Sequence, residues 1–467
     1  MTGSRTDSSV VLHANIESLK LPHGKLLCQG TQLTVGCGEV CLLRAPVGWG
    51  KTVLLRLLSG WGDHIHGLEV NAEIILNGHC FHLPTDMAAY RKTARTSIAC
   101  MFHQLRDESF GVTLEEEMEQ IRLRYQHFAG SMPHCAQVFL ANVERFDLHT
   151  RTDSIAKGVR QMLAVIDVLA DVEQRQMVML DEPSSFLASH TVHLLQELLR
   201  WTAARNPRCA VLIASHDSRA VPDKSRVMSF DIVGDDRKRQ SIDLDPLRTV
   251  MRRVRSTESV SINIEGHPVA HGIRLPFRFD IAIQAGKSAL ITGPNGSGKT
   301  TYLLSAAGLY RVDGMYAVAR ADGRRIARRH VLRGWVGLVF QEPHEYEFRS
   351  QVADILRAPK SFNDTCSEAW EEFVLTVLHA YDIAPPQDPR SLSTGQLRVV
   401  WLLSQVGWCS TWLLDEIDAG LDSVAMAMVN QIILIHQECG GSVLAVTHRP
   451  ELFSSGTFDE IQLGMEN

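Results

Sequence analysis

Short apolar runs recur along the chain in the same order in its two halves. Each half has one such run, residues 40–43 and 288–291, followed at once by a glycine-rich loop and then by a helical pattern. Later in each half come a run that ends in glutamine, a run that ends in two acids and a run that ends in histidine. Apolar runs of this length, bounded by turn residues, are typical of buried strands in parallel sheets. The pattern therefore predicts an α/β chain in which one unit is repeated.

The two glycine-rich loops have the chemistry of a phosphate site. Residues 293–301 satisfy the G-x-x-x-x-G-K-[ST] pattern, whereas residues 45–53 repeat it with Ala45 for the first glycine and Trp49 for the serine. Backbone N–H groups of such a loop can surround phosphate oxygens, the lysine reaches the terminal phosphates, and the helix that follows points its positive end at the anion. The candidate nucleotide-binding residues are Ala45, Pro46, Val47, Gly48, Trp49, Gly50, Lys51, Thr52, Val53, Gly293, Pro294, Asn295, Gly296, Ser297, Gly298, Lys299, Thr300 and Thr301.

Two later strands end in paired acids, Asp181-Glu182 and Asp415-Glu416. Downstream of a phosphate loop, the aspartate can hold Mg²⁺ together with the loop threonine, and the glutamate can act as general base on an attacking water. This chemistry is the hydrolysis of a nucleoside triphosphate. The expected cofactors are thus ATP and Mg²⁺, with catalytic residues Glu182 and Glu416 and metal ligands Thr52, Asp181, Thr300 and Asp415.

All these motifs recur at an interval of about 230 to 250 positions, which indicates a duplicated domain. Between the copies lies a charged stretch that contains a proline and breaks the strand pattern. We therefore expect a first domain over residues 1–235, a linker over residues 236–257 and a second domain over residues 258–467.

Residues 392–396 read Leu-Ser-Thr-Gly-Gln, shortly before the second acid pair. With the two phosphate loops and the acid pairs, this motif resembles the nucleotide-binding domains of ABC ATPases. The resemblance implies two P-loop NTPase domains in tandem, each with a helical subdomain, that pair head to tail with ATP between one phosphate loop and the other half's signature. It implies these further site residues: Ser393, Thr394, Gly395 and Gln396 at the nucleotide, Gln104 and Gln341 at Mg²⁺, and His216 and His448 at the γ-phosphate.

The two halves differ in their signatures. Residues 155–159 of the first half read Ile-Ala-Lys-Gly-Val, so Ala156 replaces the serine and Val159 the glutamine. If the halves pair as in the family, each ATP site combines one altered and one intact motif. We expect the site built on Lys51, Glu182 and Ser393 to turn over faster, because losing the signature serine should harm more than Ala45 in place of glycine.

Residues 339–348, which begin Val-Phe-Gln-Glu-Pro, resemble the corresponding loop of energy-coupling-factor and cobalt-type transporter ATPases. That resemblance implies uptake of a vitamin or metal ion through separate membrane subunits, a scaffold and a substrate-binding component, with this chain on the cytoplasmic face of the membrane. The alternatives are a fused sugar-importer ATPase and a soluble ABC ATPase that acts on ribosomes or nucleic acid. The short linker argues against the latter, since tandem translation factors join their halves by a long basic helix.

Composition indicates the class of protein and which kinds of partner are not expected. The 467 residues are 45% hydrophobic and 21% charged with a net charge of −6, which is ordinary for a globular protein and gives no general attraction to nucleic acid. Residues 1–9 are polar and no run of about 18 apolar residues occurs, so neither a signal peptide nor a membrane span is expected. The ten cysteines are scattered, as expected for free thiols in a reducing compartment. Metal binding by His79, Cys80 and His82 is not expected, because no second ligand group follows at matching spacing.

Overall fold

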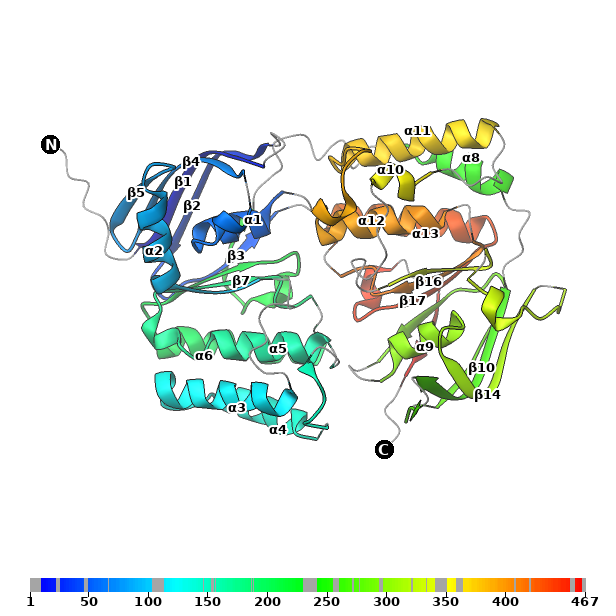
Figure 1. The fold of residues 1–467 in the computed structure, drawn as a ribbon, viewed down its shortest axis with the longest axis horizontal. Coiled ribbons are helices and arrows are strands. Elements are labelled where there is room, and N and C mark those ends of the chain that lie inside the picture. Colours follow the sequence, from blue (N-terminus) through cyan, green and yellow to red (C-terminus); the bar gives the residue numbers. More distant parts are fainter. Residues whose placement is uncertain are drawn as a thin grey trace. The chain divides into compact units, whose positions relative to one another are not determined.

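The computed structural model describes residues 10–21, 26–45, 49–65, 67–102, 113–145, 147–152, 155, 157–185, 187, 189–229, 242–254, 260–270, 273–276, 278–293, 297–320, 322–332, 334–340, 351–357, 364–406, 409–419, 421–453 and 458–463. The chain divides into two compact units, Met1–Asp235 and Asp236–Asn467 (Figure 1). Each unit combines an antiparallel sheet, a parallel sheet and packed helices. The expected tandem α/β architecture is therefore confirmed.

The first unit has an antiparallel sheet in the order β2-β1-β4-β5 and a parallel sheet in the order β6-β7-β8-β3-β9. Its strands are β1 (Val10–Lys20), β2 (Leu26–Gly36), β3 (Val40–Arg44), β4 (Glu69–Leu76), β5 (His79–Leu83), β6 (Ile98–Met101), β7 (Met177–Asp181), β8 (Ala210–Ala214) and β9 (Arg226–Ser229). Its α-helices are α1 (Lys51–Leu58), α2 (Met87–Ser97), α3 (Leu114–Arg124), α4 (His134–Val143), α5 (Lys157–Val168) and α6 (Ser189–Arg205).

The parallel sheet of the first unit is buried between two hydrophobic cores. Successive side chains of a strand point to opposite faces, so β7 sends Val178 and Leu180 into the core under α3 to α6 and Met177 and Met179 into the core under α1 and the antiparallel sheet. Every residue of β7 and β8 is buried. This explains why both strands read as continuous apolar runs in the sequence.

The second unit repeats this topology. Its parallel sheet has the order β15-β16-β17-β13-β18, which matches the first unit strand for strand, and in its antiparallel sheet β10 pairs with β11, β12 and β14. The strands are β10 (Val260–Ala270), β11 (Ile273–Arg274), β12 (Phe279–Ile283), β13 (Ala289–Thr292), β14 (Arg311–Arg320), β15 (Val336–Val339), β16 (Thr411–Asp415), β17 (Ser442–Val446) and β18 (Asp459–Gln462). The α-helices are α8 (Asp245–Val254), α9 (Lys299–Ala306), α10 (Val352–Ile355), α11 (Asp364–Ala380), α12 (Thr394–Gln405) and α13 (Ser423–Glu438).

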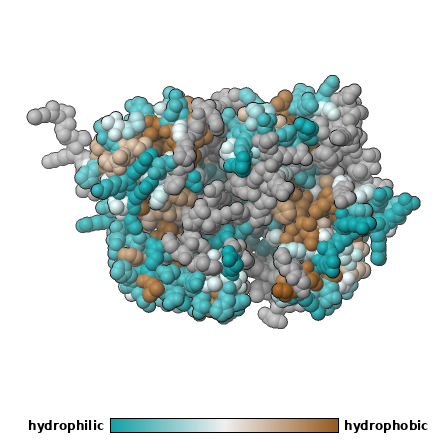
Figure 2. All heavy atoms as spheres, viewed as in Figure 1, coloured by the Kyte–Doolittle hydropathy of each residue, from teal (hydrophilic) through white to brown (hydrophobic). Residues whose placement is uncertain are grey.

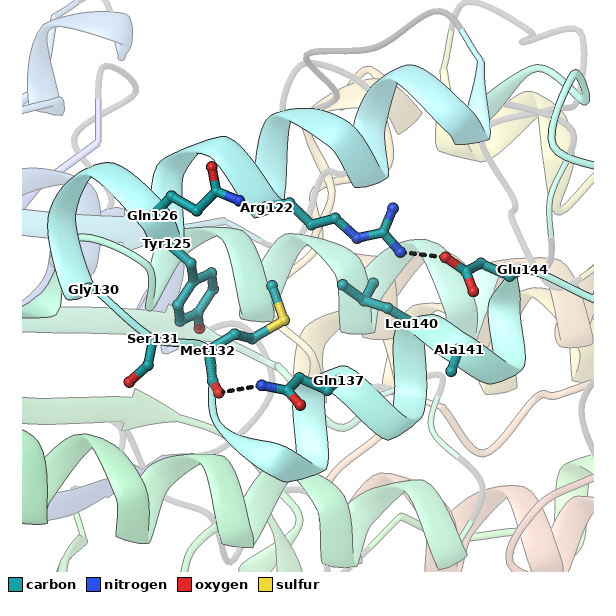
Figure 3. A pocket seen from close by; sticks show the side chains of 10 residues that line it. All are labelled: Arg122, Tyr125, Gln126, Gly130, Ser131, Met132, Gln137, Leu140, Ala141 and Glu144. Carbon is teal, nitrogen blue, oxygen red and sulfur yellow. Dashed lines mark hydrogen bonds and ion pairs between the residues drawn. The ribbon is translucent and has the colours of Figure 1, made fainter.

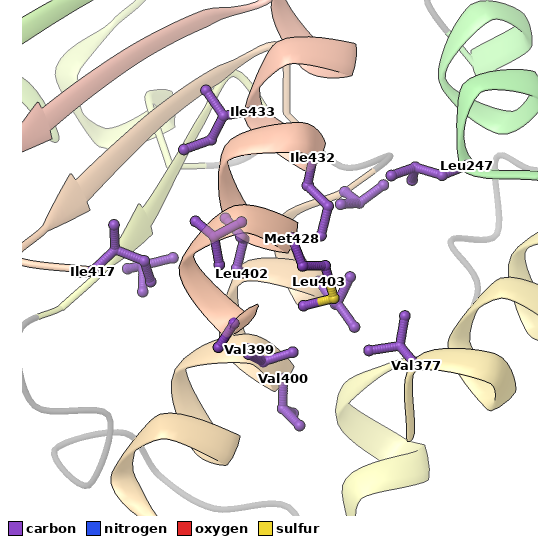
Figure 4. Close-up of a cluster of buried hydrophobic side chains, with 14 of the residues drawn as sticks. Leu247, Val377, Val399, Val400, Leu402, Leu403, Ile417, Met428, Ile432 and Ile433 are labelled. Carbon is purple, nitrogen blue, oxygen red and sulfur yellow. The ribbon is translucent and has the colours of Figure 1, made fainter. Parts of the chain in front are cut away.

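Helices α11, α12 and α13 share one hydrophobic core with the parallel sheet of the second unit. Figure 4 shows Val399, Leu403, Met428 and Ile432 within this cluster, and Val377 reaches it from α11. In each unit the helical elements between the glutamine-ending strand and the signature helix, α3 and α4 or α10 and α11, supply the expected helical subdomain. A capping box in which Thr113 and Glu116 bond to each other's backbone N–H fixes the start of α3.

Helix α8 was not foreseen, because it lies inside residues 236–257, which the sequence analysis treated as a linker. Leu247 and Val250 of this helix are fully buried in the core of the second unit, and Arg248 Nη2 lies 3.3 Å from Glu438 Oε2 of α13. Its apolar residues recur at helical spacing, whereas the charged residues Asp245 and Arg252 are exposed.

Among the residues that Figure 2 colours, hydrophilic ones predominate on the face in view, with hydrophobic ones in patches among them. Exposed large hydrophobic side chains in the described part of the chain include Ile273 and Leu375. The bulk of the apolar residues is taken up by the four cores, two in each unit.

Candidate active site

In the first unit the phosphate loop leads into α1, whose first residue is Lys51. Gly50 directly before it has φ 98°, and a Cβ there would lie 2.8 Å from Leu27 Cδ1, so this turn needs glycine. Lys51 Nζ donates to the carbonyl oxygen of Ala45 at 3.0 Å and lies 2.5 Å from His216 Nε2. The ammonium group is thus held at the start of the phosphate loop, where it can bind the terminal phosphates of a nucleotide.

The second unit repeats this arrangement at α9. Gly298 has φ 87°, and Lys299 Nζ donates to the carbonyl oxygen of Gly293 at 2.9 Å. Gly293 itself has φ 149°, and a Cβ there would lie 2.4 Å from the carbonyl oxygen of Leu463. Ala45 is not among the described residues with positive φ, so the first loop accepts alanine where the second requires glycine.

Trp49 stands in the first loop where the second has Ser297. The structure places its side chain in the core between the antiparallel sheet and α1, with 2% of its surface exposed. Its counterpart Ser297 is equally buried. The substitution therefore adds apolar packing beneath the loop.

Behind the first loop, Thr52 Oγ1 donates to Asp181 Oδ2 at 2.6 Å. Asp181 is fully buried, and its Oδ1 has no hydrogen-bond partner among the described residues. A buried carboxylate oxygen without a donor, beside a threonine hydroxyl, fits a Mg²⁺ site, because this ion prefers hard oxygen ligands. In the second unit Thr300 Oγ1 donates to Asp415 Oδ2 at 3.0 Å. The two threonine–aspartate pairs that the sequence singled out are therefore brought together in both units.

Glu182 follows Asp181 with a left-handed backbone, φ 49°, held by a bond from its N–H to the carbonyl oxygen of Ala214 at 2.7 Å. Its Oε2 accepts from Ser215 Oγ at 2.9 Å, and its Oε1 lies 3.6 Å from His216 Nε2 and 3.9 Å from Lys51 Nζ. Burial raises the pKa of Glu182 to about 7, although the charge of Lys51 acts to lower it.

Glu416 occupies the matching position with φ 47°, and its N–H donates to the carbonyl oxygen of Val446 at 3.0 Å. Its Oε1 lies 3.2 Å from His448 Nε2. Burial acts to raise the pKa of Glu416, but the hydrogen bond and charge of His448, followed by the charges of Lys299 and Arg398, hold it below its usual range. A non-glycine residue with positive φ is uncommon, and finding one at the same acid in both units is typical of a functional constraint.

The signature of the second unit forms the start of α12. Ser393 caps the helix, since its Oγ accepts from the N–H of Gln396 at 3.3 Å, while Gln396 Oε1 accepts from the N–H of Ser393 at 3.0 Å. Ser393 is exposed, whereas Gln396 is buried and donates from Nε2 to the carbonyl oxygen of Tyr381 at 2.9 Å. The motif thus presents a serine at a helix N-terminus, a good place for an anion.

The first unit has no such serine at the start of α5. Val159 is half-buried there, and Gln161 Nε2 donates to the carbonyl oxygen of Glu182 at 2.6 Å. Several expected site residues lie outside the described residues, or have side chains outside them: Pro46, Val47, Gly48, Gln104, Ala156, Pro294, Asn295, Gly296, Gln341 and Thr394.

Three charged residues behind Glu416 escaped the sequence analysis. Arg449, next to His448, donates from Nε to Asp418 Oδ2 at 3.2 Å and from Nη2 to the Asp418 carbonyl oxygen at 2.6 Å. Arg398 is 1% exposed. Burial lowers its pKa to about 10, although the negative charges of Asp418 and Glu416 act to raise it. Aligning the halves would have revealed the set, because the first half has Gln161, Ser184 and Asp217 at these positions.

A separate pocket of about 280 Å³ lies in the helical part of the first unit, where α3 turns toward α4 (Figure 3). Arg122 pairs with Glu144 across its rim, and Gln137 Nε2 donates to the carbonyl oxygen of Met132 at 2.9 Å. None of the expected nucleotide, metal or catalytic residues lines this pocket, so it is not the site that the motifs predict.

Comparison with known proteins gives consistent results. The family model described as ABC transporter matches residues 28–185 and 277–418. The chain is 27% identical over 191 residues to the "Cytochrome c biogenesis ATP-binding export protein CcmA" of Gluconobacter oxydans, covering 40% of this chain and 82% of that one. It is 25% identical over 319 residues to a "Putative ABC transporter ATP-binding protein" of Sulfurisphaera tokodaii, covering 65% of each, slightly less than two thirds.

Two solved structures share the fold over nearly the whole chain. "RNase-L Inhibitor" has a TM-score of 0.54 at 17% identity, covering 96% of this chain and 90% of that one. "Model of ribosome-bound archaeal Pelota and ABCE1" has a TM-score of 0.59 at 17% identity, covering 93% and 74%. At this identity the likeness concerns the fold. Among the helices that the structure describes, none has the length and apolarity needed to cross a membrane.

Proposed function

The chain belongs to the ABC transporter family as an ATPase with two nucleotide-binding domains, and we propose that it drives transport through separate membrane subunits. The observation that carries the proposal is one set of residues found in both copies of the fold. The set consists of a lysine, a threonine–aspartate pair, a glutamate whose backbone is left-handed, and a histidine. Among sequence relatives, the proteins described above are named as ATP-binding components of transport systems.

In each half the lysine binds the terminal phosphates and the glutamate accepts a proton from the attacking water. Thr52 with Asp181, and Thr300 with Asp415, would hold Mg²⁺, which offsets phosphate charge when bound. His216 and His448 lie against the glutamates, where each can orient the carboxylate and contact the γ-phosphate. In this proposal the halves pair head to tail, so that Ser393, Thr394, Gly395 and Gln396 act on the ATP held by Lys51.

A narrower proposal is uptake of the energy-coupling-factor type. It rests on the resemblance of residues 339–348, of which only Val339 and Phe340 are among the described residues. A fused sugar importer is the competing transporter type. In either case the partners are integral membrane proteins and the chain works at the cytoplasmic face of the membrane.

Action on ribosomes is the second candidate function. It is favoured by one observation, the match of 93% of this chain to a ribosome-bound protein. Against it stands the net charge of −6, which gives no general attraction to RNA.

Purification of the tagged full chain from native cells distinguishes transport through membrane subunits from action on ribosomes. Under transport, the chain is recovered with the membrane fraction and detergent extracts retain integral membrane proteins on it. The Glu182→Gln/Glu416→Gln double variant, in which bound ATP should persist, strengthens any such association. Co-sedimentation of that variant with ribosomes, and its absence from membranes, would overturn transport in favour of the second candidate.

A further inference from the structure

The hairpin of β4 and β5 in the first unit gathers three metal-binding side chains. Cys80 and His82 lie two positions apart on β5, so both face the same side, and the strand register places Glu73 of β4 directly opposite His82. One ligand atom from each of the three lies within 4.8 Å of the others. The sequence analysis expected no metal here because no second ligand group follows at matching spacing, but pairing across the strands brings Glu73 beside His82.

The distances resemble those of a metal site. Cys80 Sγ lies 3.8 Å from His82 Nε2, and His82 Nδ1 lies 3.7 Å from Glu73 Oε2. Bonds of about 2.3 Å to sulfur and about 2.0 Å to nitrogen at a tetrahedral ion put those two ligands roughly 3.5 Å apart. The 3.7 Å contact of Glu73 is to the other ring nitrogen, but one ligand atom from each of the three residues lies within 4.8 Å of the others. Rotations of these side chains are therefore enough for the thiol, one imidazole nitrogen and the carboxylate to share one ion.

The backbone beneath these side chains is well anchored. On the opposite face of β5, Phe81 packs edge-on against Tyr90 with ring centroids 5.3 Å apart, and Leu83 is buried in the core. Asp86 accepts the N–H of His82 at 2.8 Å, which fixes the end of the strand. Ligands held on a rigid hairpin lose little entropy on binding an ion.

The local charge also favours a cation. Glu73 lies directly opposite His82, and Asp86 accepts the N–H of His82, so two carboxylates lie at this part of the hairpin. A cation relieves this concentration of negative charge and displaces the thiol proton on binding. The second unit offers a natural contrast, since the matching turn carries Arg324 and Arg325 instead.

We propose that Glu73, Cys80 and His82 bind a single Zn²⁺ ion at the surface of the first unit. Thiolate and imidazole together select Zn²⁺ over Mg²⁺, which prefers oxygen ligands. With three protein ligands, the fourth tetrahedral position is open to water. The site is distinct from the threonine–aspartate pairs of the ATPase chemistry.

Titration of the reduced, untagged full chain with Co²⁺, followed by Zn²⁺ competition, tests the proposal. The wild type is expected to bind about one equivalent with a thiolate-to-cobalt absorption band that Zn²⁺ removes. Cys80→Ser and His82→Gln should each abolish the band and weaken Zn²⁺ binding at least about tenfold. Both positions are exposed, so these changes leave the fold intact.

Cys37→Ser is the matched control, because Cys37 is another exposed thiol of the same unit and its loss should leave the band unchanged. A wild type without the band, or a band that survives Cys80→Ser, would overturn the site.

Discussion

Glu182 and Glu416 occupy the same place in two copies of one fold, yet their surroundings differ in charge. Glu182 is bonded by the Ser215 hydroxyl, and Gln161 binds its backbone carbonyl. Glu416 is bonded by His448 instead. Burial prevails at Glu182 and raises its pKa to about 7, whereas His448 and nearby cations hold the pKa of Glu416 low.

The difference in charge around the two glutamates arises at three positions behind them. Where the second half has Arg398, Asp418 and Arg449, the first has Gln161, Ser184 and Asp217, and Asp217 there binds Arg219 of its own loop. Two of these positions, Gln161 and Ser184, are uncharged in the first half, whereas all three are charged in the second, as expected when one buried charge requires another. The halves thus share the reacting groups and differ in the residues that support them.

The largest effect is expected from removing the general base of one half at a time. Glu182→Gln and Glu416→Gln should each lower ATP turnover by about 100-fold or more at the affected site, because the amide cannot accept the proton of water. Our sequence-based ranking predicts the greater loss of total turnover for Glu182→Gln. Steady-state rates at saturating ATP check this, and a greater loss for Glu416→Gln would reverse the ranking of the two sites.

The charged set behind Glu416 should show strong coupling. Arg449→Ala should reduce the free energy of unfolding by about 3 to 5 kcal/mol, because it removes the cation that is hydrogen-bonded to the buried Asp418. The combined Arg398→Gln/Asp418→Ser/Arg449→Asp variant, which copies the first half, should recover much of that loss. Urea unfolding of the single and combined variants measures this, and losses that simply add would contradict a coupled network.

The helical part of the first unit carries a pH-dependent group that the second lacks. Burial raises the pKa of Asp167 on α5 to about 6, opposed by Arg124 and reinforced by Glu117 and Asp171. The matching position of α12 is Ser404. A carboxyl whose pKa is higher in the folded state binds its proton more tightly there, so the stability it confers is present near pH 4 and is lost as pH rises through about 6.

That titration should change the free energy of unfolding by about 3 kcal/mol, from a shift of roughly two pKa units. Urea unfolding between pH 4 and 7 measures it, with Asp167→Asn as the variant that should lack this slope. Identical slopes for both proteins would contradict the assignment.

The smallest effect is expected on stability, when the signature serine that caps α12 is removed. Ser393→Ala gives the second half the residue that the first has at position 156 and should cost about 1 kcal/mol of stability by removing the bond to the Gln396 N–H. Thermal unfolding detects this. Ser393→Thr, which keeps a hydroxyl, should retain most of the stability, and equal losses for both variants would argue against capping.

Local patterns were enough to predict the duplicated strands and the residues at their ends. Lys51, Asp181 and Glu182 could be found because each follows an apolar run or glycine loop in sequence. Cross-strand neighbours could not be found this way, so Glu73 was missed beside His82. The burial of Trp49 was missed for the same reason, since it depends on a sheet formed by distant residues.

The prediction of a linker was based on charged residues alone and did not consider the spacing of the apolar residues among them. Helix α8 was taken as linker because its arginines stood out, although Leu247, Val250 and Met251 recur at helical spacing. Arg398 was missed for the opposite reason, because a single arginine in an apolar helix gives no signal until the two halves are aligned.

We expect both halves to retain a working nucleotide site despite their different surroundings. Equilibrium dialysis of labelled ATP against the Glu182→Gln/Glu416→Gln double variant counts these sites directly, since bound ATP is not consumed. Two ATP molecules should bind per chain, falling to one when Lys51→Ala or Lys299→Ala is added. A single ATP per chain before either lysine is changed would contradict this expectation.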